Sequence, residues 1–388
     1  MRREQLVRAV RGGASLRQAA GRFGMSVGTA AYWVARAHGR RLDRVDFADR
    51  TPGRAANRTT PCVEQRIVHT RQRLREKSTL GEYGPDAIVA ALRIGGRAAP
   101  SRATVHRVLA RQGALDHVHR VRRPAPPRGW YLPAVASAAA ELDSFDFIED
   151  LKIARGPLVS VLTATSVHGA LADAWITAQP SAQATVRALC KRWRHDGLPA
   201  YAQFDNDTIF QGAHQFADTV GRVSRLCLAL GVIPVFAPPR EPGFQNPIEG
   251  FNALWQSKVW QRYAMRTVAH AAELSDDYIA AHRAKTVQRR AHAPARRPWP
   301  RGFKLDLKAP LTGTMIFLRR SDEHGAVTCM GRRFVLKTRR IQRLVRCEVD
   351  FNHERIRFFA LRRRAPESQP LLHQVRYQKP TRRFLGKP

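Results

Sequence analysis

Apolar positions repeated at helical spacing, together with capping residues, predict short helices over residues 1–45. Ser15 is followed three residues later by Gln18, which is the spacing of a capping box; Gly24 can end that helix, and Ser26 can cap the next. Two short helices joined by a glycine-containing turn are typical of a helix-turn-helix unit, whose second helix enters the major groove. The predicted apolar stripes are Leu16, Ala19, Ala20 and Phe23 on the first helix, and Ala31 and Val34 on the second. The candidate DNA-contacting residues are Ser26, Gly28, Thr29, Tyr32 and Arg36.

Residues 60–116 predict a second, winged-helix-like unit of the same kind. Residues 63–78 have the pattern of a basic helix, Pro85 can begin another, and Ser101 can cap a third. Two such units in tandem favour DNA binding over an ordinary helical bundle. The candidate DNA-contacting residues here are Ser101, Arg102, Thr104 and Arg107.

The proline- and arginine-rich stretch 117–135 predicts a semi-rigid linker. From residue 136 to 285 three strand patterns come first, and strands then alternate with helices in the order βββαβαβα. This order predicts a mixed sheet covered by helices. Residues 213–231 predict a single helix. Its expected buried face consists of Phe216, Val220, Val223, Cys227 and Leu230.

Short, regularly spaced strand patterns separated by turns fill residues 305–365. They predict a small all-β barrel, with arginines at the strand ends that suit contacts to a DNA backbone. Residues 366–388 are polar and basic and predict a flexible tail.

Charge is distributed unevenly along the chain. The formal net charge is +36, yet residues 136–260 carry a net charge of −2 and the flanking residues carry +38. Basic arms around an acidic core favour a polyanion partner. Five scattered cysteines without a CxxC pair argue against a disulfide framework or a thiolate zinc site. The charged first residues and the lack of a long apolar run predict a cytoplasmic protein without a membrane partner.

Three acids fall where the predicted topology brings chain ends together. Asp146 lies in the first strand of the core, Asp205 ends the fourth, and Glu249 lies in the first turn of the last helix. Converging carboxylates repel each other unless cations lie between them, and hard oxygen ligands suit Mg²⁺ or Mn²⁺. Two such ions could activate one oxygen and stabilise another in a phosphodiester displacement. The predicted catalytic and metal-binding residues are therefore Asp146, Asp205 and Glu249.

These positions, with the segments FDNDTIF (204–210) and REPGFQNPIEGFN (240–252), resemble the catalytic core of the DDE transposase and retroviral integrase superfamily. The whole chain is most similar to bacterial insertion-sequence transposases. The resemblance implies an α/β, RNase H-like mixed-sheet core, preceded by all-α helix-turn-helix units and followed by a small all-β barrel. It also implies metal-dependent DNA cleavage and strand transfer by a multimer on DNA, in a nucleoid-associated bacterial protein.

Alternatives remain for each acid. Asp143 competes with Asp146 as the first acid, and Glu149 and Asp150 lie nearby. Asp207 occupies the position where the superfamily has glycine, so it is a turn residue or an additional ligand. In the superfamily about 35 residues usually separate the second acid from the third. Here 35 residues separate Asp205 from Glu241, whereas 43 residues separate Asp205 from Glu249. NPIEGFN matches the superfamily's helix start apart from Pro247, which favours Glu249.

The leading hypothesis is a transposase that binds the ends of its mobile element and cuts and joins DNA without a small-molecule substrate. A catalytically inactive DNA-binding regulator derived from a transposase is the alternative, and the presence of all three acids argues against it. A nuclease acting on RNA hybrids would leave the two helix-turn-helix units without a role.

Overall fold

The computed structural model describes residues 2–48, 59–94, 98–115, 128–213, 216–241, 243–336, 340–363 and 365–379. The chain divides into two compact units, Met1–Arg66 and Ile67–Pro388, and each is described by itself. No helix among the described residues is both long and apolar enough to cross a membrane.

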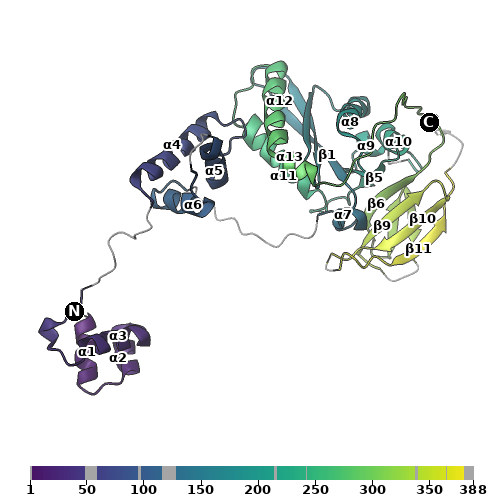
Figure 1. The fold of residues 1–388 in the computed structure, drawn as a ribbon. Coiled ribbons are helices and arrows are strands. Elements are labelled where there is room, and N and C mark those ends of the chain that lie inside the picture. Colours follow the sequence, from purple (N-terminus) through teal and green to yellow (C-terminus); the bar gives the residue numbers. More distant parts are fainter. Residues whose placement is uncertain are drawn as a thin grey trace. The chain divides into compact units, whose positions relative to one another are not determined.

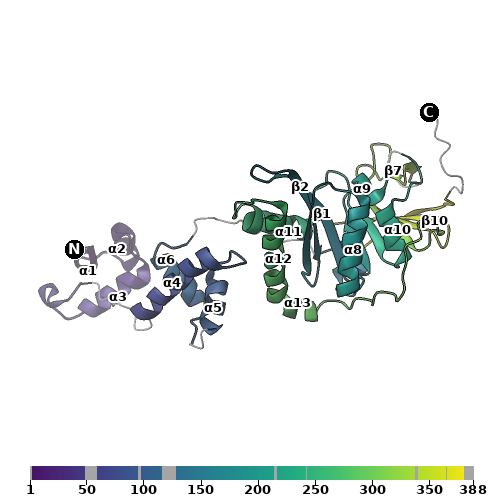
Figure 2. The ribbon, with the colours of Figure 1, turned by 90° about the horizontal axis from the view of Figure 1, so that it is seen from above.

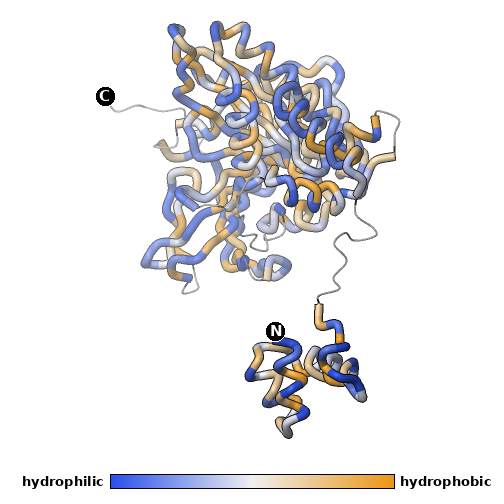
Figure 3. Tube along the Cα trace, turned by 90° about the vertical axis from the view of Figure 1, so that its left-hand side faces the viewer, coloured by the Kyte–Doolittle hydropathy of each residue, from blue (hydrophilic) through white to orange (hydrophobic). Residues whose placement is uncertain are grey.

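The first unit contains three short helices and a 3₁₀ turn: α1 (Arg2–Arg11), α2 (Leu16–Phe23), α3 (Val27–Ala37) and η1 (Leu42–Arg44). The predicted caps are confirmed. Ser15 and Gln18 form a capping box, Gly24 ends α2 in the left-handed conformation, and Ser26 accepts a hydrogen bond from the Thr29 amide. Along these helices hydrophilic and hydrophobic residues alternate within a turn (Figure 3).

The predicted apolar stripes of this unit are only partly right. Ala19 and Ala20 are buried, but the Leu16 side chain is 36% exposed. On α3 the buried residues are Ala30, Trp33 and Ala37, one position before the predicted stripe in each turn. The large indole of Trp33 sets the rotation of the helix, because burying it removes more apolar area than burying Ala31 and Val34.

Three further helices follow: α4 (Pro61–Lys77), α5 (Pro85–Ile94) and α6 (Arg102–Arg111). Ser101 caps α6 as predicted by accepting a hydrogen bond from the Thr104 amide. The core between α5 and α6 consists of Ile88, Val89, Leu92, Val105, Val108 and Leu109. The apolar spacing thus places the remaining face of α6 toward solvent.

The central sheet has the predicted mixed topology. Three antiparallel strands, β1 (Leu142–Lys152), β2 (Leu158–Ser166) and β3 (Ala172–Thr177), are followed by β4 (Tyr201–Phe204) and β5 (Ile233–Phe236). Both β4 and β5 run parallel to β1, giving the order β3-β2-β1-β4-β5. This arrangement confirms the RNase H-like fold class.

Helices cover both faces of this sheet. On one face α8 (Ala182–Asp196) and α10 (Arg222–Ala229) share an apolar cluster with Phe145 and Phe204. On the other face lie α11 (Asn246–Trp255), the π-helix η2 (Gln256–Trp260) and α12 (Val268–Lys285), followed by α13 (Val287–Ala291). Figure 2 shows α8 and α11 on opposite sides of β1 and β2. The two faces therefore present different surroundings to alternate residues of β1.

The helix predicted over residues 213–231 is wrong in its first half. The chain forms the short helix α9 (Thr208–Gln211), then turns, and helix α10 begins only at Arg222. Gly212 has a φ of 101°, and a Cβ added to it would lie 2.7 Å from the Gly221 nitrogen. This close approach of two glycines closes the turn and leaves Phe216 47% exposed. Residues 214–215 lie outside the described residues.

The C-terminal region is all-β as predicted, but its strands do not form a separate barrel. It contains β6 (Thr314–Arg320), β7 (Ala326–Cys329), β8 (Arg332–Val335), β9 (Leu344–Asp350), β10 (Arg355–Ala360) and β11 (Leu371–Arg376). Strand β6 pairs in parallel with β5, so β6-β9-β10-β11 continue the central sheet, as Figure 1 shows. Strand β11 also lies within the predicted tail, of which residues 380–388 lie outside the described residues.

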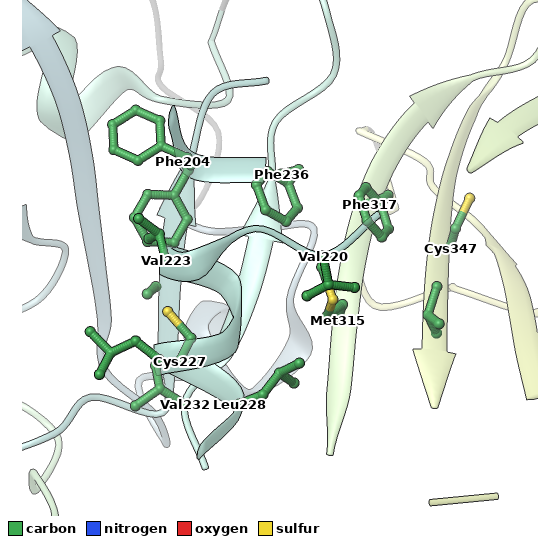
Figure 4. Packing of buried hydrophobic residues seen from close by; sticks show 14 of the residues in the cluster. Phe204, Val220, Val223, Cys227, Leu228, Val232, Phe236, Met315, Phe317 and Cys347 are labelled. Carbon is green, nitrogen blue, oxygen red and sulfur yellow. The ribbon is translucent and has the colours of Figure 1, made fainter. Parts of the chain in front are cut away.

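Aromatic packing explains this continuation. The rings of Phe236 on β5 and Phe317 on β6 stack with centroids 5.1 Å apart. Figure 4 shows these rings in the same cluster as Phe204, Met315 and Cys347. A barrel with its own core would have left this edge of β5 uncovered.

The predicted linker also contains folded residues. Trp130, Tyr131 and Leu132 are buried, and α7 (Pro133–Ala136) follows them directly. Residues 116–127 lie outside the described residues. The three apolar side chains pack with Leu142 and Val235 of the central sheet, so the core begins before residue 136.

Candidate active site

Asp146 and Asp205 are brought to one edge of the sheet by parallel pairing. The paired register of β1 and β4 runs to Ser144 opposite Gln203, and each acid lies two residues beyond that pair. Asp146 on β1 therefore lies beside Asp205, the residue directly after β4, because neighbouring strands lie roughly 4.8 Å apart in a sheet. Both acids lie on the face covered by α11, because side chains two residues apart share a face.

Strand alternation separates Asp143 from this face. Its side chain points to α8, where it is fully buried and accepts hydrogen bonds from Arg192, Arg296 and the Trp193 indole. Despite the cost of burial, the two guanidinium groups hold the pKa of Asp143 far below its usual range. Its oxygens are thus committed to protein partners, which leaves Asp146 as the candidate first acid.

Asp146 is held against α11. The Asn252 side-chain nitrogen donates a 2.8 Å hydrogen bond to one Asp146 oxygen, and the Phe147 amide donates to the other. Thr163 on β2 lies within hydrogen-bonding distance of the Asn252 amide oxygen, which fixes the orientation of that side chain. Burial, together with the charges of Asp205 and Glu249, raises the pKa of Asp146 to about 7.

Glu249 lies on the exposed side of the first turn of α11, three residues before Asn252. Ile248, Phe251 and Trp255 form the buried stripe of this helix, as predicted, and the stripe continues to Val259 of η2. This stripe sets the rotation of α11, so that Asn252 reaches Asp146 while Glu249 faces solvent. The negative charge of Glu249 still contributes to the raised pKa of Asp146.

Glu241 has a different partner. It forms an ion pair with Arg320 at the end of β6, and the hydrogen bond from Arg320 lowers its pKa. The interval of 35 residues therefore leads to a carboxylate that fastens the loop before α11 to the C-terminal strands.

The segment FDNDTIF has a defined turn geometry. Asp205 accepts a 3.0 Å hydrogen bond from the Asp207 amide, and Asp207 in turn caps α9 by accepting from the Ile209 amide. The φ of Asp207 is −60°, so this position does not require the backbone freedom of the glycine that the superfamily has. Burial raises the pKa of Asp205, and the charges of Asp207 and Glu149 raise it further.

Neither Glu149 nor Asp150 shares the environment of Asp146. Both are exposed, and the pairing of β1 with β2 shifts register between Ile148 and Leu151. Asp150 has a φ of 56°, which marks it as the bulged residue. The bulge leaves Glu149 near enough to raise the pKa of Asp205 by charge repulsion.

The fit of these acids to a metal rests on the chemistry of the donors. Among the described residues, no group of three or more His, Cys, Asp or Glu side chains is close enough together to hold an ion. The oxygen donors of Asp146, Asp205 and Glu249 nevertheless match the hard ligands that Mg²⁺ and Mn²⁺ require. Burial and then repulsion from the charges of Asp205 and Glu249 raise the pKa of Asp146, and a nearby cation would relieve the repulsion. The Asn206 amide oxygen is also buried without a hydrogen-bond partner.

The candidate DNA-contacting residues of the first unit lie on the outer side of α3. Ser26, Gly28, Thr29 and Tyr32 are exposed, and Arg36 is half-buried. The Arg36 guanidinium donates to the Tyr32 hydroxyl at 2.9 Å and packs over the Trp33 ring. This face therefore presents a hydroxyl and a cation in fixed positions.

On α6, Ser101, Arg102 and Arg107 are exposed and Thr104 is half-buried. Arg102 forms an exposed ion pair with Asp86 at 2.9 Å, so its charge is partly neutralised. The Arg107 guanidinium donates to the Thr104 hydroxyl and the Ala103 carbonyl, both uncharged, and so keeps its charge at the surface. The sequence did not reveal the Asp86 contact, which joins α5 to α6.

Strand order and acid positions together define an RNase H-like domain with a candidate carboxylate site. No protein-family profile and no curated protein matches the chain. Among solved structures, the chain is similar to the simian T-cell lymphotropic virus intasome in complex with PP2A regulatory subunit B56 gamma, determined by cryo-electron microscopy. The sequence identity is 12% and the TM-score is 0.29, and the match covers 67% of this chain and 84% of that chain. The catalytic core domain of BIV integrase is similar at 17% identity and a TM-score of 0.26, covering 36% and 81%. Both similarities are weak, and the fold class depends on strand order and direction.

Proposed function

We propose that this protein is a DDE-type transposase that cleaves DNA at the ends of its mobile element and joins them to target DNA. The observation that carries the proposal is the placement of Asp146 beside Asp205 on parallel strands, with Asn252 holding Asp146 against the helix that bears Glu249. The basic flanks and the two three-helix units support DNA as the substrate.

Asp146, Asp205 and Glu249 would hold the divalent ions, two Mg²⁺ or Mn²⁺. When bound, these ions supply an activated oxygen nucleophile and stabilise the leaving oxygen. The role of this chain's residues is to orient the carboxylates. Asn252 orients Asp146 by its hydrogen bond, and the Asp207 amide orients Asp205. Each Asp146 oxygen that accepts one hydrogen bond keeps a lone pair for another partner, and the Asp207 amide uses only one of the two Asp205 oxygens.

In this proposal the exposed faces of α3 and α6 bind the element ends. The nucleophile of the joining step is the freed 3′-hydroxyl of the element. Two ends must be handled together, so the active form is a homomultimer on DNA. A protein with this function would act on the DNA of a bacterial cell, so we propose that it is cytoplasmic and associated with the nucleoid.

Metal-dependent nicking and strand transfer of a labelled duplex that carries the gene's own flanking sequence test this proposal. With Mg²⁺ or Mn²⁺, wild-type protein should cut and join the duplex, and Asp205→Ala should reduce the rate by about 1,000-fold or more because a ligand is lost. Asp207→Asn is the matched control, since asparagine caps a helix as well as aspartate does and should retain activity. Tight binding without nicking by wild type would overturn the proposal in favour of the inactive regulator.

A further inference from the structure

A threonine hydroxyl lies within the apolar face of β2 that packs against α11. Side chains two residues apart share a face of a strand, so Thr163 has the same surroundings as Val159 and Val161. Those valines belong to the apolar cluster that also contains Ile248 and Phe251 of α11, and Thr163 itself has no exposed surface. A hydroxyl buried among apolar side chains is unfavourable unless it is hydrogen-bonded. Packing alone would therefore favour a third valine at this position.

Asn252 of α11 is the hydrogen-bond partner of this hydroxyl. The Thr163 oxygen lies 2.6 Å from Oδ1 of Asn252 and 3.1 Å from the backbone carbonyl oxygen of Asp146. A hydroxyl has only one proton to donate, and an amide oxygen can only accept. Nδ2 of Asn252 donates at 2.8 Å to a carboxylate oxygen of Asp146, and the opposite orientation of the amide would turn its oxygen toward that carboxylate. The donors therefore run in one direction, from Thr163 to Asn252 and from Asn252 to Asp146.

This chain of hydrogen bonds joins three elements. Thr163 is the residue of β2 that pairs with Asp146 of β1, so both side chains lie on the face covered by α11. Asn252 is 8% exposed and lies three residues after Glu249, which is about one turn of the helix. The contact therefore fixes the first turns of α11 against both strands, and with them the backbone that carries Glu249.

We propose that Thr163 is a positioning residue for the candidate metal site. Its hydroxyl orients the Asn252 amide, and the amide in turn holds the Asp146 carboxylate and the turn of α11 that bears Glu249. Groups that orient the ligands of a metal in this way typically change metal affinity by about 10- to 100-fold. This role rests on the proposed function, because it concerns the carboxylates of the same site.

Thr163→Val removes the hydroxyl and keeps the size and β-branched shape of the side chain, so the fold should be retained. Oδ1 of Asn252 is then buried without a donor, and the amide no longer has a fixed orientation. We expect Mn²⁺ to bind the full-length variant about tenfold more weakly than the wild type, because Asp146 is less well oriented. Electron paramagnetic resonance of free Mn²⁺, in the absence of DNA, measures the dissociation constants. Thr163→Ser restores a hydroxyl on the same Cβ and should recover most of the lost affinity.

Thr165→Val is the matched control. Thr165 lies on the same face of β2, two residues further along the strand, and is also buried. The side chain of Asn252 bonds to Thr163 and Asp146, so Thr165 is not part of the chain of hydrogen bonds. This variant makes the same chemical change and should bind Mn²⁺ as the wild type does. Equal weakening by Thr163→Val and Thr165→Val would mean that any loss of a buried hydroxyl disturbs the site, and would overturn the proposal.

A double variant separates positioning from a general effect on packing. In an Asn252→Ala background the hydroxyl has no amide to orient, so adding Thr163→Val should weaken Mn²⁺ binding no further. A packing defect would lower the affinity by the same factor in both backgrounds, and that result would overturn the proposal. In the nicking assay Thr163→Val should lower kcat while leaving KM for the duplex unchanged, because the buried hydroxyl cannot touch DNA.

Failure of this proposal can be distinguished from failure of the proposed function. If the wild type binds Mn²⁺ and Asp205→Ala does not, but Thr163→Val binds it as the wild type does, only the role of Thr163 is overturned. Weaker Mn²⁺ binding by Thr163→Val that Thr163→Ser reverses, together with no nicking by the wild type, would support the role of Thr163 and count against strand transfer. Failure of the wild type to bind Mn²⁺ would overturn both.

Discussion

At the scale of single residues, alternation along β1 decides which aspartate lies with the other acids of the candidate site. Asp143 and Asp146 are three residues apart and so point to opposite faces of the sheet. Asp143 faces α8 and is neutralised by Arg192 and Arg296, whereas Asp146 faces α11 and other acids. Two aspartates in one strand thereby have oppositely shifted pKa values.

The raised pKa of Asp146 makes stability depend on pH. Between its ordinary pKa of 3.8 and about 7, the folded chain keeps a proton that the unfolded chain has released, so folding is favoured at low pH. This contribution is lost as the pH rises through 7. Asp146→Asn cannot ionise. In metal-free buffer we expect the unfolding free energy of wild type, relative to this variant, to fall by about 2–4 kcal/mol from pH 4 to pH 8. Urea titration followed by tryptophan fluorescence measures it, and a rise would contradict the raised pKa.

Asp143→Asn should behave in the opposite way. The lowered pKa of Asp143 gives stability that is present above its ordinary pKa and lost on acidification. At pH 7 the substitution should cost about 3–5 kcal/mol, because it breaks a buried ion pair and leaves the fully buried Arg192 with less compensation. The same titrations at pH 7 and at pH 3 check this, and an equal cost at both would argue against the ion pair as the cause.

At the scale of elements, the end of α11 joins the central sheet and its helices to the segment between α4 and α5. The helix continues into the π-helix Gln256–Trp260, where Lys258 donates to the Gly81 carbonyl at 3.1 Å. Arg262 donates to the Ser78 carbonyl, and Leu80 packs against the apolar cluster of α11 and α12. Single π-turns of this kind often occur at functional positions.

Substituting both Lys258 and Arg262 by alanine should release this segment. We expect hydrogen exchange at residues 78–83 to accelerate by about tenfold or more, because the two side chains lose three hydrogen bonds to backbone carbonyls, each worth roughly 1 kcal/mol. Arg266→Ala removes an exposed arginine nearby and is the matched control. Unchanged exchange in the double variant would show that other contacts, such as Leu80 and the Lys285–Glu82 ion pair, hold the segment without them.

At the scale of the whole molecule, the C-terminal strands belong to the core. Parallel pairing of β5 with β6 joins Phe236 to Phe317 in one apolar cluster, so the central sheet runs without a break from β3 to β11. The first unit, Met1–Arg66, has its own small core around Trp33. The stability of the central sheet should therefore depend on the C-terminal strands and not on the first unit.

Two truncations test this difference. Removing residues 306–388 exposes the edge of β5 and removes twelve of the thirty buried residues of the shared cluster. It should abolish cooperative unfolding of the remaining chain. Removing residues 1–58 should leave the main thermal transition within about 4 °C of that of the intact chain, because no core residue of the sheet is lost. Differential scanning calorimetry of both proteins measures this. A cooperative transition in the first truncated protein would favour an independent C-terminal domain.

Residue types and spacings that act over short stretches of the chain determined much of the secondary structure of this protein. Capping residues around Ser15 and Ser26, the buried stripe of α11 and the order of strands and helices follow from residue type and spacing, because each depends on neighbours along the chain. Alternation also contained enough information to assign Asp143 and Asp146 to different faces.

Contacts between distant residues decided the rest. The sequence did not reveal that Arg192 and Arg296 neutralise Asp143, that Arg320 holds Glu241, or that Asn252 binds Asp146, since each pair is at least 49 residues apart. The strands after residue 305 alternate as a barrel's would. Only the packing of Phe317 on Phe236 places them in the central sheet, because the free edge of β5 and the shared apolar cluster are products of the folded chain.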